Sequence, residues 1–142
     1  MKKLSYLLLL LCTLSLSACV TPNMQTLPAK EPNRGALMLY SSTLYPTQSY
    51  NVLIDGNKQG DVEGGKVRVV YLTPGLHTIR IDVSYLTKPL EKTFAVKNGE
   101  YYFMNVYTTP YNGSRNATAF HLELVPRDQA MSYLRSQSSF MF

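Results

Sequence analysis

Few residues in this 142-residue chain have the chemistry that catalysis needs. There are two histidines, His77 and His121, and two cysteines, Cys12 and Cys19. His77 falls on the apolar side of an alternating stretch, which predicts a partly buried imidazole with hydrogen-bonded nitrogens. His121 alternates with apolar neighbours, and we expect it to face solvent. Two histidines without carboxylates at ligand spacing make a weak metal site, so we predict no bound metal and no cofactor.

The other motifs of catalysis are also incomplete. No serine stands in a Gly-x-Ser-x-Gly context, and the carboxylates are scattered. Gly60–Val67 has the glycine and lysine spacing of a phosphate loop. However, Val67 stands where a magnesium-binding Ser or Thr is needed, and a strand pattern follows instead of a helix. The sequence therefore predicts a chain that is not an enzyme.

Tyrosine is the residue type best suited to binding. The chain has eleven Tyr and no Trp, and Tyr45, Tyr50, Tyr107 and Tyr111 lie near expected loops or strand ends. An exposed tyrosine offers a flat apolar ring with a polar tip, which suits sugar rings or a protein partner. These four residues are our candidate binding surface. The alternative is that most tyrosines are half-buried residues of a sheet.

The N-terminus has the layout of a secretory signal. Met1-Lys2-Lys3 is positively charged, residues 4–16 are an apolar run, and the small residues Ser17 and Ala18 follow. The apolar run is shorter than the ~20 residues that a membrane-spanning helix needs. We therefore expect an export signal over residues 1–18 that is cleaved.

The stretch Leu16-Ser17-Ala18-Cys19 resembles the lipobox of bacterial lipoproteins. The resemblance implies that the Cys19 thiol receives a diacylglycerol, that cleavage occurs before Cys19, and that the new amine is acylated, for example with palmitate. The three acyl chains that result would anchor the protein stably in a bilayer. Val20 is not Asp, which in this family implies sorting to the outer membrane, with the domain in the periplasm. The alternative is an ordinary cleaved signal with an unmodified Cys19.

Cleavage before Cys19 leaves 124 residues with a formal net charge of +3, because Lys2 and Lys3 leave with the signal. This length is enough for one domain with an apolar core. An acylated Cys19 leaves the domain without a free thiol, so no disulfide supports it. The basic excess is small and unclustered, and we therefore expect no nucleic-acid partner.

Alternating apolar residues and turn dipeptides predict an all-β domain over residues 35–136. Asp55-Gly56, Pro74-Gly75 and Asn98-Gly99 are turn signals. The expected strands are 36–42, 50–55, 58–62 (short at best), 66–72, 76–85, 90–97, 100–108 and 117–125, followed by a helix over 127–136. These elements predict an antiparallel β-sandwich, immunoglobulin- or transthyretin-like, of about seven to eight strands with a short C-terminal helix. We expect 100–108 to be central and buried on both faces.

Two segments flank this domain. Residues 19–34 contain Pro22, Pro28 and Pro32 without apolar periodicity, which predicts a lipidated N-terminus and a flexible tether. Residues 137–142 form the expected C-terminal tail. The loop at 109–116 contains Pro110 and Gly113, and we expect it to be exposed.

The stretch between residues 52 and 107 resembles a PEGA-type surface domain. The resemblance lies in Val52–Gly56, Gly60, Leu72–Ile79 and Gly99–Phe103. Together with the lipobox and the final strand and helix, it is similar to a bacterial lipoprotein family with a PEGA-like β-sandwich, domain of unknown function 2846. The resemblance implies a small β-sandwich at the cell envelope and no reaction.

Three functional hypotheses follow. The first is a lipid-anchored envelope lipoprotein that acts as a non-catalytic binding or scaffolding module for an envelope protein. The second is an accessory subunit of an envelope machine such as a secretion system, with the 109–116 loop as its interface. The third is an enzyme that acts on cell wall or lipid, since a serine and a base distant in sequence could still meet in the folded chain.

Overall fold

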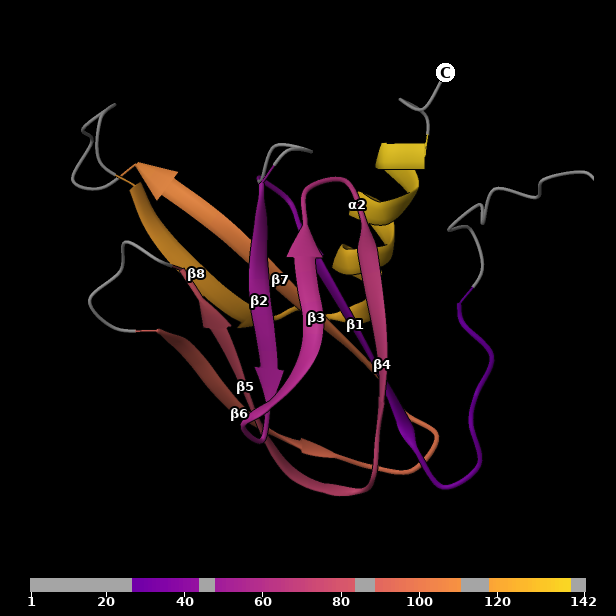
Figure 1. Ribbon diagram of the computed structural model, residues 1–142. Helices are drawn as coiled ribbons and strands as arrows, with labels where there is room; N and C mark the ends of the chain where they lie inside the picture. Colours follow the sequence, from indigo (N-terminus) through magenta and orange to yellow (C-terminus); the bar gives the residue numbers. More distant parts are fainter. Residues whose placement is uncertain (1–26, 44–47, 84–88, 111–117, 139–142) are drawn as a thin grey trace, which may run out of the picture.

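The computed structural model describes residues 27–43, 48–83, 89–110 and 118–138, and all statements below concern this part of the chain (Figure 1). It is an all-β sandwich of two four-stranded sheets with one C-terminal helix, which confirms the predicted fold class. The elements are β1 (Gly35–Ser41), β2 (Ser49–Ile54), β3 (Asn57–Glu63), β4 (Val67–Leu72), β5 (Gly75–Asp82), β6 (Leu90–Val96), β7 (Tyr101–Pro110), β8 (Thr118–Leu124) and α2 (Arg127–Ser138).

The strand order is β4-β1-β7-β8 in one sheet, sheet A, and β3-β2-β5-β6 in the other, sheet B. Neighbouring strands are antiparallel with one exception among the described pairs. β1 lies parallel to β7, with Ala36 opposite Tyr101 and Ser41 opposite Val106. This parallel pair is an exception within the antiparallel sandwich that we predicted, and it places the first strand between two strands that are distant in sequence.

Local sequence explains the hairpin between β2 and β3. Asp55 and Gly56 have φ angles of 51° and 79°, so two successive residues adopt the left-handed region. This pair of positive angles is the mark of a two-residue turn that suits the twist of a hairpin. The register shifts at Val52/Leu53, opposite Gly60, whose φ is 107°. β3 is a full seven-residue strand despite this irregularity, and it is longer than the 58–62 segment that we expected.

The apolar core has two layers. Between the sheets lie residues at alternate strand positions, among them Leu37, Leu39, Val52, Ile79 and Val106. The second layer lies between sheet A and α2, and it contains Met38, Tyr40, Phe103, Ala130, Met131 and Leu134. Because sheet B covers one face of β1 and α2 the other, every residue of β1 is buried.

The expectation that 100–108 is buried on both faces is wrong for the second half of β7. This strand is central in sheet A, but its residues from Tyr107 onward are half-buried or exposed. The reason is that α2 covers the outer face at Phe103 and does not continue over the end of β7. No helix within the described residues is long and apolar enough to cross a membrane.

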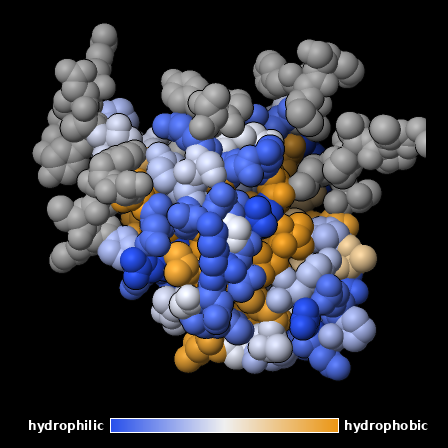
Figure 2. Space-filling view, viewed as in Figure 1, coloured by the Kyte–Doolittle hydropathy of each residue, from blue (hydrophilic) through white to orange (hydrophobic). Residues whose placement is uncertain are grey.

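The outer face of sheet B is polar. Asn51, Thr78, Arg80 and Thr93 point away from the core, and Thr78 Oγ1 lies 2.9 Å from Thr93 Oγ1 across the β5–β6 pair. In the view of Figure 2, the surface over β2 and β3 is largely hydrophilic. This polar-out, apolar-in alternation is the pattern expected for a sheet with one solvated face.

Residues 27–34, which we call the docked segment, lie against sheet A. The Tyr101 hydroxyl donates to the Pro28 carbonyl oxygen at 2.8 Å, and the Tyr71 hydroxyl donates to Ala29 at 2.7 Å. Leu27 packs against the apolar layer beneath α2. The docked segment belongs to the stretch that we predicted to be a tether, so the described part of that stretch is held by the domain.

Candidate functional site

The outer face of sheet A carries a polar cluster where α2 does not cover it. Met104 and Val106 face the core between the sheets, so Tyr107 and Thr109 of β7 point to the outer face. His121 of β8 lies directly opposite Tyr107 in the register, and Glu123 follows on the same face. We call Tyr107, Thr109, His121 and Glu123 the Tyr107 cluster.

Ring stacking and hydrogen bonds hold the Tyr107 cluster together. The Tyr107 and His121 rings stack with centroids 4.8 Å apart and an interplanar angle of 18°. His121 Nε2 lies 2.8 Å from Thr109 Oγ1. A hydrogen bond to the Glu123 carboxylate raises the pKa of the Tyr107 phenol, so the hydroxyl stays a donor. The cluster therefore presents aromatic faces, an imidazole and a carboxylate on one surface, which suits a polar partner with planar groups.

The contact between Thr109 and His121 does not have the geometry of a catalytic triad. A triad base is oriented by an acid on its far nitrogen and serves a nucleophile near donors that stabilise an oxyanion. In the described part of the chain, the His121 ring is instead held by stacking on Tyr107, on an open sheet face.

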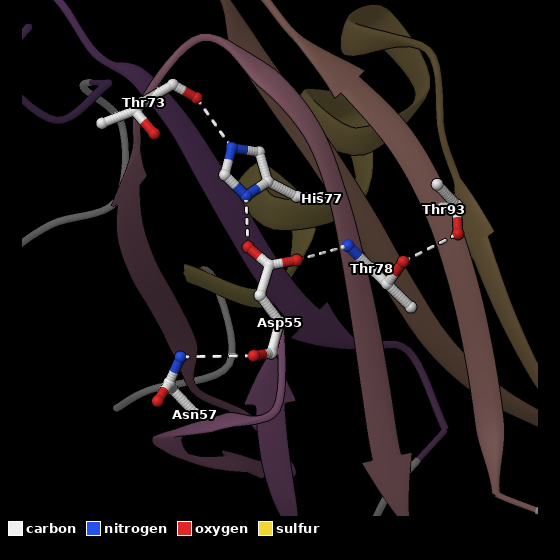
Figure 3. Close-up of polar contacts among 6 residues, drawn as sticks. All are labelled: Asp55, Asn57, Thr73, His77, Thr78 and Thr93. Carbon is white, nitrogen blue, oxygen red and sulfur yellow. Dashed lines mark hydrogen bonds and ion pairs between the residues drawn. The ribbon is translucent and has the colours of Figure 1, made fainter.

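A second polar group lies at the opposite end of the sandwich, around His77 (Figure 3). Its Nδ1 lies 2.6 Å from Asp55 Oδ2, and its Nε2 lies 2.7 Å from the Thr73 carbonyl oxygen. Asp55 Oδ1 also accepts the backbone N–H of Thr78 at 2.9 Å. The predicted partly buried, hydrogen-bonded imidazole at His77 is confirmed, with 11% of the side chain exposed.

These contacts favour the charged form of both partners. Burial opposes a charge on His77, but its hydrogen bonds to Asp55 and Thr73 outweigh burial and raise its pKa above the ordinary value. The Thr78 N–H, then the His77 ring, lower the pKa of Asp55. Because both ring nitrogens face acceptors, neither is available as a base, and the pair ties the β2–β3 turn to the start of β5.

The structure separates the candidate tyrosines. Tyr107 lies in the Tyr107 cluster on the outer face of sheet A. Tyr50 lies on the inner side of sheet B, where it packs against the core and meets Phe120 edge-on at 5.7 Å. The half-buried alternative therefore holds for Tyr50, and the two rings do not form one surface. Tyr45, Tyr111 and Cys19 lie outside the described residues, as does most of the 109–116 loop.

Sequence reasoning missed three members of these groups. Asp55 lies 22 residues before His77 in the sequence, so no local motif predicted the contact between them. Thr109 and Glu123 belong to the Tyr107 cluster through the β7–β8 register alone. In the stretch that resembles a phosphate loop, Gly60 lies in β3, Gly64 and Gly65 form a turn, and Lys66 lies directly before β4 and pairs with Glu63. No group of three or more His, Cys, Asp or Glu among the described residues could hold a metal ion.

No protein-family model and no curated protein sequence matches this chain. The similarity to a PEGA-like lipoprotein family stays a prediction from the residues that carry it.

Proposed function

We propose that this chain is a lipid-anchored bacterial envelope lipoprotein whose β-sandwich is a non-catalytic binding or scaffolding module at the outer membrane. The observation that carries the proposal is the apolar N-terminal run that ends in Leu16-Ser17-Ala18-Cys19. The partner we expect is another envelope protein, and the Tyr107 cluster is the surface that would meet it.

The docked segment limits how far the domain can lie from the bilayer. It begins at Leu27, and eight residue steps separate it from Cys19. A fully extended chain covers at most about 3.3–3.6 Å per residue, so eight steps reach no more than about 29 Å. A lipid on Cys19 would therefore hold the docked segment within about 29 Å of the bilayer surface. The module would act on partners in or next to the membrane.

The hydrogen bonds of the two histidines support the non-catalytic part of the proposal. Both nitrogens of His77 face acceptors, and His121 is stacked on Tyr107 with its Nε2 at Thr109. Imidazole is the side chain best placed for acid–base chemistry near neutral pH. Here both rings are engaged in structural contacts.

Intact mass and membrane fractionation test the anchor. Wild type, Cys19→Ser and Cys12→Ser would be expressed in a bacterial host, and the protein would be weighed from separated inner and outer membranes. We expect wild type and Cys12→Ser to begin at residue 19 with added acyl chains, and Cys19→Ser to lose them. An unlipidated wild-type mass would refute the anchor.

A photo-cross-linking amino acid at Glu123 tests the binding role. The matched control carries the same amino acid at Glu91, which is exposed on β6 of sheet B. We expect position 123 to capture an envelope protein in intact cells and position 91 to capture none. A single stoichiometric neighbour would favour the accessory-subunit hypothesis. Equal labelling from both positions, or from neither, would refute a binding role for the Tyr107 cluster.

A further inference from the structure

Three residues form a row across the outer face of sheet A, next to the docked segment. In the register, Ala36 of β1 lies opposite Tyr71 of β4 on one side and opposite Tyr101 of β7 on the other. Residues paired in this way share a face of the sheet. Because alanine is small, the two tyrosines form walls on either side of a low floor. We call Tyr71, Ala36 and Tyr101 the tyrosine cradle.

The tyrosine cradle holds the backbone of residues 27–30. The Tyr101 hydroxyl donates to the Pro28 carbonyl oxygen, and the Tyr71 hydroxyl donates to the next carbonyl oxygen, that of Ala29. Residues 27–30 lie outside the strands of sheet A, so these contacts come from side chains of the sheet. Since both contacts are to carbonyl oxygens, they do not depend on which side chains the bound segment carries.

Three side chains of the segment add shape and charge to this backbone recognition. Leu27 packs against the apolar layer between sheet A and α2, and Lys30 Nζ lies 5.4 Å from the centre of the Tyr101 ring. Pro28 has a fixed φ angle and restricts Leu27 to an extended conformation, so the segment loses little freedom when it binds. A pre-extended proline segment in a groove lined by aromatic residues is a recurring mode of peptide recognition.

The docked segment has a separate fixed point where it enters β1. The Arg34 carbonyl oxygen accepts the N–H of Gly99 at 2.9 Å. Pro32 and Asn33 form the turn before it, and the φ of 57° at Asn33 suits the third position of such a turn. In Figure 1 the docked segment runs down beside the sandwich and turns into β1 at its lower end. Residues 27–30 can therefore leave the cradle by rotation at this turn while β1 stays in the sheet.

We propose that the tyrosine cradle is a binding site for an extended, proline-containing segment of a partner protein, and that residues 27–30 occupy this site until the partner replaces them. The segment that fits has an apolar residue directly before the proline and a basic residue two positions after it, as residues 27–30 have. The contacts that carry the proposal are separate from the Tyr107 cluster, and they do not require a lipid on Cys19.

Occupation by residues 27–30 sets the affinity that a partner experiences. A partner segment binds only those molecules whose cradle is open, so its apparent dissociation constant is the intrinsic constant divided by the open fraction. Leu27→Ser removes the apolar contact of the docked segment and leaves every residue of the cradle unchanged. We therefore expect Leu27→Ser to bind an added segment about tenfold more tightly than wild type does.

Fluorescence polarisation with labelled peptides tests this exchange on full-length protein purified in detergent. The first peptide has the sequence of residues 27–34. The second keeps only its leucine, first proline and lysine, with serine elsewhere, and the third has the composition of the second in an order that breaks their spacing. We expect the first two to bind Leu27→Ser about tenfold more tightly than wild type, and the third to bind neither. Equal affinities for wild type and Leu27→Ser, or equal binding of the third peptide, would overturn the proposal.

Further substitutions in the Leu27→Ser chain test whether the peptide binds in the cradle. Tyr71→Phe/Tyr101→Phe removes both hydroxyl donors and keeps both rings, and we expect it to weaken peptide binding about fivefold or more. The matched control is Tyr102→Phe, which removes a hydroxyl from the opposite face of β7 and should leave the affinity unchanged. If the double variant does not fold by circular dichroism, Tyr101→Phe alone decides the question. Equal losses from the cradle variant and the control would overturn the proposal.

Sedimentation of wild type separates a partner from a second copy of this chain. Exchange of residues 27–34 between two copies would fill both cradles and produce a dimer. We expect wild type to sediment as a monomer with its cradle occupied by its own segment. A wild-type dimer that the first peptide dissociates would show that a second copy fills the cradle, and it would overturn the assignment of the site to a partner protein.

Discussion

The contact between Asp55 and His77 gives the stability of the domain a pH dependence that one conservative substitution removes. Asp55→Asn keeps the size of the side chain, and Asn-Gly favours the same two-residue turn as Asp-Gly. The Asn oxygen can still accept the Thr78 N–H. Its amide nitrogen cannot accept the proton on His77 Nδ1, so the substitution removes the contact to the imidazole and leaves the turn.

The two pKa shifts give the direction in which the stability changes with pH. The pKa of His77 is raised above its ordinary 6.5, so its contribution is complete below that value and is lost as pH rises through the folded-state pKa. The pKa of Asp55 is lowered from 3.8, so its contribution is present above that value and is lost as pH falls through the folded-state pKa. The pair therefore stabilises most between these two ordinary values. Above them, the unfolding free energy of wild type should fall as pH rises.

The size of the expected change in the free energy of unfolding depends on how exposed the two side chains are. A hydrogen bond to a charged group contributes roughly 1.5–3 kcal/mol when it is well shielded. Here the His77 side chain is 11% exposed but that of Asp55 is 45% exposed, so water screens the pair. We expect Asp55→Asn to lower the free energy of unfolding by about 1 kcal/mol near pH 6, and by less near pH 8.5. For a domain of this size, 1 kcal/mol corresponds to a Tm change of about 4–8 °C.

Urea unfolding at several pH values measures this effect. The eleven tyrosines and the absence of tryptophan make tyrosine fluorescence a clean probe. Wild type should lose stability between about pH 6 and pH 8.5, while Asp55→Asn should give a flatter curve. Asn51→Ala is the control: it changes an exposed residue on the same sheet that carries no titratable group, and it should keep the wild-type slope. Parallel curves for wild type and Asp55→Asn would refute the role of the pair.

Three further predictions concern packing. Gly60→Ala should lower the free energy of unfolding by roughly 1–3 kcal/mol, because residue 60 has a φ of 107° and a Cβ there would meet Arg68. Gly56→Ala, where a Cβ would meet nothing within 4 Å, should lower it by less in urea titration. Leu134 lies between α2 and sheet A and is 6% exposed, so Leu134→Ala leaves a cavity there. It should lower the free energy of unfolding by about 2–4 kcal/mol in the same assay. Tyr101→Phe should leave global stability within about 1 kcal/mol but speed tryptic cleavage of the docked segment, because it removes a 2.8 Å hydrogen bond to that segment.

Local patterns predict most of the strands but not their neighbours. The alternation predicted for residues 76–85 and the Asp55-Gly56 turn depend on residues close in sequence. The turn is present as expected, and so is the alternation over β5, the part of that stretch that the structure describes as a strand. The position of β1 between β4 and β7 depends on which apolar faces meet, and a strand pattern does not name its partner. For the same reason, the strand with both faces buried is β1, not the more aromatic β7.

The residues of the candidate site also divide into those that local sequence predicts and those that depend on strand pairing. The sequence alone was enough to place Tyr107 near a strand end and to predict a hydrogen-bonded His77. It could not pair His77 with Asp55 or bring Thr109 and Glu123 to Tyr107 and His121, because these contacts depend on the register between strands.

Secondary structure, the fold class and the N-terminal signal pattern are properties of residues that are near one another in the chain. Alternation sets which side chains of a strand share a face, and glycine at a turn sets where the chain can reverse. Sheet order, the covering of β1 by α2 and the hydrogen bonds from Arg68 to β3 exist only once distant strands have packed. The physical reason is that burial and hydrogen bonds between strands belong to pairs of surfaces, and the tertiary structure alone decides which surfaces meet.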